Sequence, residues 1–248
     1  METMERRERA TEVEGDRPRW RDGIALGVGG VVVGTLSLMA VYGEVFADAL
    51  VFLAVLAGLG LWTLRTPSTR LRWVVAALMA LFVAINLVFA VSDLAHPESP
   101  GPFVTTAIVV LFGIATVALA AGSARRRPLP LVPVLGGVGA LLVVAAVVAA
   151  VAASGVDDDV AQPGDVTIVA EDFDYPEVVE VDADATGLLV ENHDAGRHNL
   201  IVEGEIDAVE LPAGSDTRIP LDLEPGEYRY WCSVPGHDGM EGTLRVLG

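Results

Sequence analysis

Residues 230–240 read YWCSVPGHDGM and contain Cys232, the only cysteine in the 248 residues of the chain. A histidine follows five positions later at His237, and a methionine three positions after that at Met240. One cysteine cannot form an internal disulfide, and a lone thiol in an oxidising compartment is a liability unless it is buried or ligated. The stretch therefore presents two alternatives for Cys232: a buried structural thiol or a metal ligand.

Short runs of alternating apolar residues surround this stretch, and turn signals such as PAGSD and LEPGE separate them. The runs lie at residues 166–170, 177–181, 187–191, 198–202, 206–210, 217–221, 227–231 and 243–247. Many short strands at near-regular spacing, without a helical period, indicate an all-β sandwich or barrel. We therefore expect residues 165–248 to form one β domain.

Two of the four histidines flank a turn within ENHDAGRHNLIV, at His193 and His198. His198 is favoured as a partner for Cys232 because it begins an apolar alternating run, whereas His193 lies in the turn. His96, in LAHPES, is expected to be a surface residue of a loop.

A thiolate, two imidazoles and a weak thioether are the ligand set of a trigonal His₂Cys copper site with a long axial Met. The residues that supply this set are His198, Cys232, His237 and Met240. The alternative for Met240 is packing in the core, but a methionine preceded by glycine in a turn is poorly placed for that. The pattern thus predicts one copper site, and ligation is favoured for Cys232.

The segment YWCSVPGHDGMEGTLRV resembles the C-terminal signature of the cupredoxins, the blue copper proteins, and RHNLIV resembles their first-histidine strand. The resemblance covers roughly residues 165–248. It implies an eight-stranded Greek-key sandwich with a type 1 copper held by the four ligands above. It also implies that Asn199, beside the first ligand, braces the ligand loop. Two residues separate His237 from Met240, fewer than in closely similar sequences. This shorter spacing bears on the distance from the Met240 sulfur to the copper and on the reduction potential of the site.

The first 153 residues contain five apolar stretches, at residues 23–42, 45–64, 73–92, 103–124 and 131–153. Each is close to the roughly 20 residues that a helix needs to cross a bilayer. We therefore expect a five-helix transmembrane domain at residues 23–153, after a disordered cytoplasmic tail at residues 1–22. The acidic, Pro- and Gly-containing residues 154–164 are expected to be a linker.

Arginines predict the orientation of these spans. All twelve arginines of this half lie before the first stretch, between the second and third, or between the fourth and fifth, and the alternate loops contain none. By the positive-inside rule the N-terminus is cytoplasmic, and five crossings place the C-terminal domain on the extracytoplasmic face of the cell membrane. Trp20, Trp62 and Trp73 fall at the predicted inner boundary.

The predicted spans contain no His, Glu, Lys or Arg, which argues against a transporter or a haem-bearing subunit. Asn86 is interpreted as an interhelical hydrogen-bonding residue. Gly30 and Gly34 form a small-xxx-small pattern, interpreted as helix packing within the chain. Because one helix would suffice as a tether, five suggest that the bundle docks against another membrane protein.

The net charge is −18, with 23 of the 34 acidic residues from Ser154 onward. A basic surface for nucleic acid is absent. The sequence predicts a membrane-anchored electron-transfer protein, not an enzyme, that passes single electrons between redox donor and acceptor proteins at the membrane. Two alternatives stay open: a copper-delivery protein without redox cycling, and a metal-free cupredoxin-like interaction module.

Overall fold

The computed structural model describes residues 20–248, and the predicted cytoplasmic tail lies almost wholly outside them. The chain forms two compact units. The first comprises the helical residues up to Gly34 together with Phe46–Ile85 and Ile108–Leu141. The second comprises Thr35–Val45, Asn86–Ala107 and Leu142–Gly248, so residues 35–45, 86–107 and 142–153 of the helical half belong with the β domain. Two of these segments, 35–45 and 86–107, are called the helix-end segments below.

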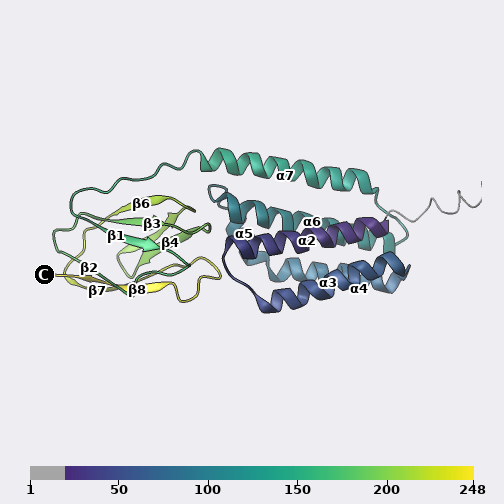
Figure 1. The fold of residues 1–248 in the computed structure, drawn as a ribbon, viewed down its shortest axis with the longest axis horizontal. Coiled ribbons are helices and arrows are strands. Elements are labelled where there is room, and N and C mark those ends of the chain that lie inside the picture. Colours follow the sequence, from purple (N-terminus) through teal and green to yellow (C-terminus); the bar gives the residue numbers. More distant parts are fainter. Residues whose placement is uncertain (1–19) are drawn as a thin grey trace, which may run out of the picture. The chain divides into compact units, whose positions relative to one another are not determined.

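The described helices follow the predicted apolar stretches with one difference. They are α2 (Trp20–Val41), α3 (Ala47–Arg65), α4 (Thr69–Ile85), α5 (Leu87–Leu94), α6 (Pro100–Ala124) and α7 (Leu131–Ala153) (Figure 1). The stretch 73–92 is not one straight helix, because α4 and α5 are bent by 57° at Asn86. The backbone of Asn86 has φ −85° and ψ 8°, outside the α-helical region, and asparagine is a weak helix former.

Four described helices are long and apolar enough to span a membrane, or five if the bent pair counts as one span. Gly30 and Gly34 lie against α6. A Cβ added at Gly30 would stand 2.3 Å from the ring of Phe112, and one at Gly34 would stand 2.8 Å from Ile108. The small-xxx-small pattern therefore lets two helices of one chain approach closely, as expected.

Arginine and tryptophan side chains cluster where α2, α4 and α6 present their arginine-bearing ends. The guanidinium of Arg72 lies 4.5 Å from the ring centroid of Trp20, and that of Arg125 lies 4.8 Å from that of Trp73. Arg72 also donates to the carbonyl oxygen of Ser123 at 2.6 Å. These contacts hold the three ends at one side of the bundle.

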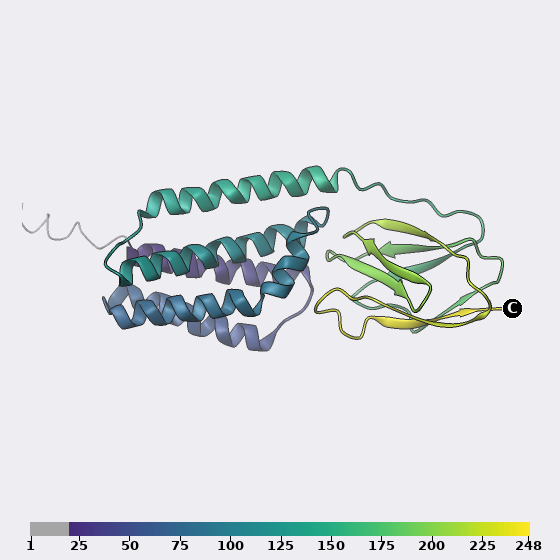
Figure 2. The same ribbon diagram turned by 180° about the vertical axis from the view of Figure 1, so that it is seen from behind.

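All eight predicted strands are present, each within two residues of its expected bounds. They are β1 (Asp165–Ala170), β2 (Val178–Val181), β3 (Gly187–Asn192), β4 (His198–Val202), β5 (Ile206–Leu211), β6 (Asp216–Pro220), β7 (Gly226–Trp231) and β8 (Glu241–Val246). Sheet order is β1-β3-β6 in one layer and β2-β8-β7-β4-β5 in the other. Figure 2 shows the strands of this domain from behind. The buried residues of both layers form one core, which includes Ile168, Leu188, Leu200, Tyr230 and Leu244.

Candidate metal centre

His198 and Cys232 lie at the same end of the five-stranded sheet. β4 begins at His198, and β7 ends at Trp231, one residue before Cys232. The two strands are antiparallel neighbours with Ile201 opposite Trp231. The start of β4 therefore lies beside the end of β7, which brings residues 34 positions apart together.

The loop after Cys232 returns the chain to this end of the sheet. The backbone N–H of Cys232 donates to the carbonyl oxygen of Met240 at 2.9 Å, and that of Met240 donates to the carbonyl oxygen of His237 at 3.2 Å. Gly236 and Gly239 have φ of 93° and 96°, a region that glycine adopts without steric cost. Because the loop closes on itself, His237 is held next to Cys232.

The three donor side chains converge. Nδ1 of His198 lies 3.0 Å from Nδ1 of His237, which lies 3.5 Å from Sγ of Cys232. One potential ligand atom from each residue lies within 4.8 Å of the others, and all three residues are buried. Among residues 20–248 this is the one such group of three or more His, Cys, Asp or Glu side chains able to hold a metal ion.

Met240 is buried at 1% exposure and belongs to the same apolar cluster as Cys232. Its backbone is hydrogen-bonded to both Cys232 and His237. The structure thus places the fourth predicted ligand beside Cys232 and His237. Whether its thioether binds a metal stays a prediction.

Asp194 contacts the candidate centre, although it belongs to none of the motifs described above. Its Oδ2 accepts from Nε2 of His198 at 2.8 Å and from the backbone N–H of Phe173 at 3.0 Å, and its Oδ1 accepts from that of Asp172 at 2.9 Å. An ionised carboxylate only accepts, so Nε2 of His198 carries the hydrogen and Nδ1 presents its lone pair. The signal that could have found Asp194 is a carboxylate four residues before a candidate ligand.

Asn192 holds the turn that carries Asp194. Its buried side chain donates to the carbonyl oxygens of Gly196 and Leu211, each at 3.1 Å, and accepts from the backbone N–H of Asp194 at 3.0 Å. These bonds satisfy a polar group that would be costly to bury unpaired. They also fix the positions of Asp194 and His198 relative to β3.

Asn199 makes the contact on which its predicted bracing role depends. Its Oδ1 accepts from the backbone N–H of Ser233 at 2.7 Å, and its Nδ2 donates to Oγ of Ser233 at 3.0 Å. The amide side chain thus ties β4 to the residue directly after Cys232.

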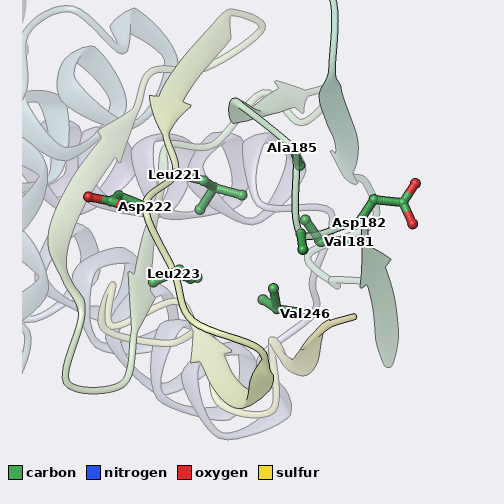
Figure 3. Close-up of a pocket in the computed structure, with 8 residues that line it drawn as sticks. Val181, Asp182, Ala185, Leu221, Asp222, Leu223 and Val246 are labelled. Atoms are coloured by element: carbon green, nitrogen blue, oxygen red, sulfur yellow. The ribbon is translucent and has the colours of Figure 1, made fainter. Parts of the chain in front are cut away.

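The other two histidines lie outside this cluster. Nε2 of His193 lies 3.4 Å from a carboxylate oxygen of Glu191, with about half of the His193 side chain exposed. Nδ1 of His96 lies 2.7 Å from Glu98. A cavity of about 100 Å³ opens at the opposite end of the sandwich (Figure 3). Its lining includes Val181, Leu221 and Val246, and the carboxylates of Asp182 and Asp222 point away from it.

Residues 139–246 match the model of the cupredoxin-like domain family. The match begins within α7 and extends to the last residue of β8. The C-terminal domain is a cupredoxin. Auracyanin B is one similar solved structure, at 20% identity and a TM-score of 0.31 over 36% of this chain and 93% of that one. A copper-containing nitrite reductase from Thermus scotoductus matches at 26% identity and a TM-score of 0.28. The match covers 38% of this chain and 25% of the reductase. A comparison with curated protein sequences finds no match.

Burial favours the neutral form of the two imidazoles at the candidate centre. It lowers the pKa of His237 to about 3, with His198 and Arg197 acting in the same direction. Burial also lowers the pKa of His198, although Asp194 opposes this. Neutral imidazole is the form that binds a metal, so both rings are ready to act as ligands.

Burial raises the pKa of the Cys232 thiol. Backbone N–H groups of Asn199 and Val234, and the charge of Arg197, act in the opposite direction. A metal ion would therefore displace a proton that burial favours, and the two amides would stabilise the resulting thiolate.

The donor set fits copper. Cupredoxins bind copper, and two neutral imidazoles with one cysteine sulfur match the chemistry of their site. The Asp194 contact fixes the ring of His198, which is the usual way that a metal-binding imidazole is oriented. Nδ1 of His237 faces Sγ of Cys232 at 3.5 Å. Nε2 of the same ring is buried and has no hydrogen-bond partner among residues 20–248.

Proposed function

We propose that this protein is a membrane-anchored electron carrier with one type 1 copper held by His198, Cys232, His237 and Met240. The observation that carries the proposal is the buried convergence of two imidazole nitrogens and one sulfur in a cupredoxin domain. Copper, when bound, supplies a one-electron Cu(II)/Cu(I) couple. The described residues contain no second cluster of this kind, which favours a carrier over a copper enzyme.

Electron transfer is favoured over copper delivery because hydrogen bonds within the chain hold the donor side chains in position. Asp194 orients His198, Asn199 ties the Cys232 loop to β4, and the backbone bonds between Cys232, Met240 and His237 close that loop. A site whose ligands barely move between oxidation states exchanges electrons with a small reorganisation cost. A delivery site needs ligands that open to release the ion.

We further propose that the helical half crosses the membrane five times, with α4 and α5 together forming the third span. The arginine-bearing ends would then be cytoplasmic and the cupredoxin domain extracytoplasmic. Redox donor and acceptor proteins at the membrane are the proposed partners. A C-terminal reporter tests the topology, and activity of that reporter only in the cytoplasm would contradict it.

The functional test uses the full chain in detergent or lipid nanodiscs, loaded with Cu(II). A redox titration should show reversible uptake of one electron per chain, with copper retained through repeated cycles in the presence of a Cu(I)-selective chelator. Loss of copper to the chelator on reduction would instead support the delivery function. If the chain binds no copper, the remaining alternative is that the domain acts as a metal-free interaction module.

A further inference from the structure

The helix-end segments contact the cupredoxin domain beside the candidate copper ligands, within one compact unit. The ring of Tyr42 meets that of His237 edge-on, with centroids 5.9 Å apart, and lies at the same distance from the ring of Phe173. Phe173 itself meets the rings of His198 and His237 edge-on, at 5.3 Å and 5.1 Å. Tyr42 and Phe173 thus both pack against the imidazole of His237, in geometries that aromatic rings favour.

Tyr42 is fixed in this position by a buried carboxylate. Its hydroxyl donates to Oδ1 of Asp93 at 2.7 Å, and Oγ1 of Thr106 donates to Oδ2 of Asp93 at 2.7 Å. Asp93 is only 2% exposed. A carboxylate is costly to bury without partners, so these two bonds make the arrangement of Tyr42, Asp93 and Thr106 mutually dependent.

Two further contacts join the helix-end segments to the turns on either side of β4 and β5. Nη2 of Arg197 donates to Oγ of Ser92, while Nη1 donates to Glu210 at 2.7 Å. The backbone N–H of Ala213 donates to Oγ of Ser99 at 3.1 Å. Arg197 and Ser99 are 5% and 0% exposed, so both contacts are shielded from water.

A third contact involves the ligand loop itself. A Cβ added at Gly236 would stand 3.4 Å from the ring of Phe89. Gly236 directly precedes His237, and Phe89 belongs to α5. Two residues of the helix-end segments therefore contact the ligand loop: Phe89 lies against Gly236, and Tyr42 lies against the ring of His237. His237 is 6% exposed, and its Nε2 is buried.

We propose that the helix-end segments form a cover over the His237 edge of the copper site, with Tyr42 as its central positioning residue. This cover keeps water-soluble one-electron reagents from reaching His237 directly. The inference rests on the proposed copper function for its redox consequence. The cover itself is independent of copper and can be tested without it.

The copper-free test is a cysteine cross-link in the full chain, in nanodiscs, with Cys232→Ser removing the native thiol. The pair Ser99→Cys and Ala213→Cys should be joined within one chain by mild oxidation or by a short bifunctional thiol reagent. The control pair Ser99→Cys and Glu203→Cys should stay open, because Glu203 lies in the turn at the far end of β4. Failure of the first pair to cross-link faster than the control would overturn the proposal.

The copper-loaded test compares access to the site in the wild type and in Tyr42→Ala. Reduction by hexaammineruthenium(II), a small hydrophilic reagent, should be several-fold faster in Tyr42→Ala. After transfer to D₂O, pulsed EPR should show faster deuterium exchange at the imidazole N–H of His237. Tyr42→Phe keeps the ring but loses its bond to Asp93, so both quantities should fall between those of the wild type and of Tyr42→Ala. Phe46→Ala removes an exposed ring from the same connection and should change neither quantity.

The proposed cover would be contradicted if the wild type and Tyr42→Ala had equal reduction rates and equal rates of deuterium exchange at His237. If Tyr42→Ala fails to retain copper, Phe89→Ala replaces it, because Phe89 covers the same edge from the other helix-end segment. Reduction and deuterium exchange should then both be faster in Phe89→Ala than in the wild type. A wild type without a type 1 copper signal contradicts the proposed function, and the cross-link then decides the cover by itself.

Discussion

Nε2 of His198 lies 2.8 Å from Oδ2 of Asp194, a residue that also accepts two backbone hydrogen bonds from the segment 172–173. The carboxylate therefore fixes both the tautomer of His198 and the loop that places Phe173 beside it. Asp172 and Phe173 have φ of 56° and 59°, an uncommon conformation for residues other than glycine. The bonds to Asp194 hold them there.

Replacing Asp194 should weaken copper binding. Asp194→Ala removes the acceptor that orients His198, and loss of such a contact typically costs about 10–100-fold in metal affinity. Asp194→Asn keeps one oxygen acceptor and should fall between Ala and wild type. Competition with a chelator of known affinity measures the change. Asp174→Asn, which alters an acceptor for the backbone of Tyr175, serves as control; wild-type affinity in Asp194→Ala would contradict the assignment.

Met240→Leu tests the axial ligand. The two side chains have similar volumes, and such swaps in a core usually cost less than about 1.5 kcal/mol. The variant should keep its colour and show a higher reduction potential, because the thioether that stabilises Cu(II) is gone. Met79→Leu, at a buried methionine of the helical bundle, should leave the potential unchanged. An unaltered potential in Met240→Leu would mean that Met240 only packs.

Asn199→Ala should loosen the Cys232 loop. It removes two hydrogen bonds to Ser233, each with a net contribution of about 1 kcal/mol. The expected result is a lower unfolding midpoint together with a changed copper hyperfine coupling, which a purely structural loss at a distance would not alter. Ser233→Ala removes only the hydroxyl partner and should show a smaller effect on both quantities.

A partly buried ion pair on the other sheet gives the cupredoxin domain a predictable acid response. Arg218 on β6 donates from Nε and Nη2 to the two oxygens of Asp165 on β1, at 2.7 and 2.8 Å. The pair passes over Gly187 of β3, where an added Cβ would stand 2.8 Å from each partner. The hydrogen bonds from Arg218 lower the pKa of Asp165 below its usual range.

Because the pKa of Asp165 is lower in the folded protein, its stabilising effect is complete above the unfolded value of about 4 and disappears as the pH falls toward the folded value. Asp165→Asn should therefore reduce the calorimetric unfolding midpoint most near neutral pH, with the difference from wild type shrinking below about pH 4. Glu227→Gln, at an exposed pair with Arg245, should have little effect. A pH-independent difference would contradict the ion-pair explanation.

The strands were predictable because each alternates apolar and polar residues between clear turn signals, and the clustering of His198, Cys232 and His237 followed from that pattern. The role of Asp194 was not predictable from the sequence, because it depends on a side-chain contact across a turn and on hydrogen bonds from the backbone of residues 172–173. The break at Asn86 was not predicted either, since α4 and α5 are both apolar and together are long enough for one span.

The contact of Tyr42 with His237 could not be predicted from either half alone. Tyr42 follows the last residue of an apolar helix, and His237 lies in a loop 195 positions later. Only the fold brings them together, through the bonds of Asp93, Arg197 and Ser99.

The most direct test of the copper assignment is to add Cu(II) to the full chain and record visible absorption and EPR, with Cys232→Ser as the matched variant. The account predicts an intense thiolate-to-copper charge-transfer band and a narrow copper hyperfine coupling in the wild type. Both should be lost in Cys232→Ser. A colourless wild type, or spectra identical in the two proteins, would contradict the type 1 site.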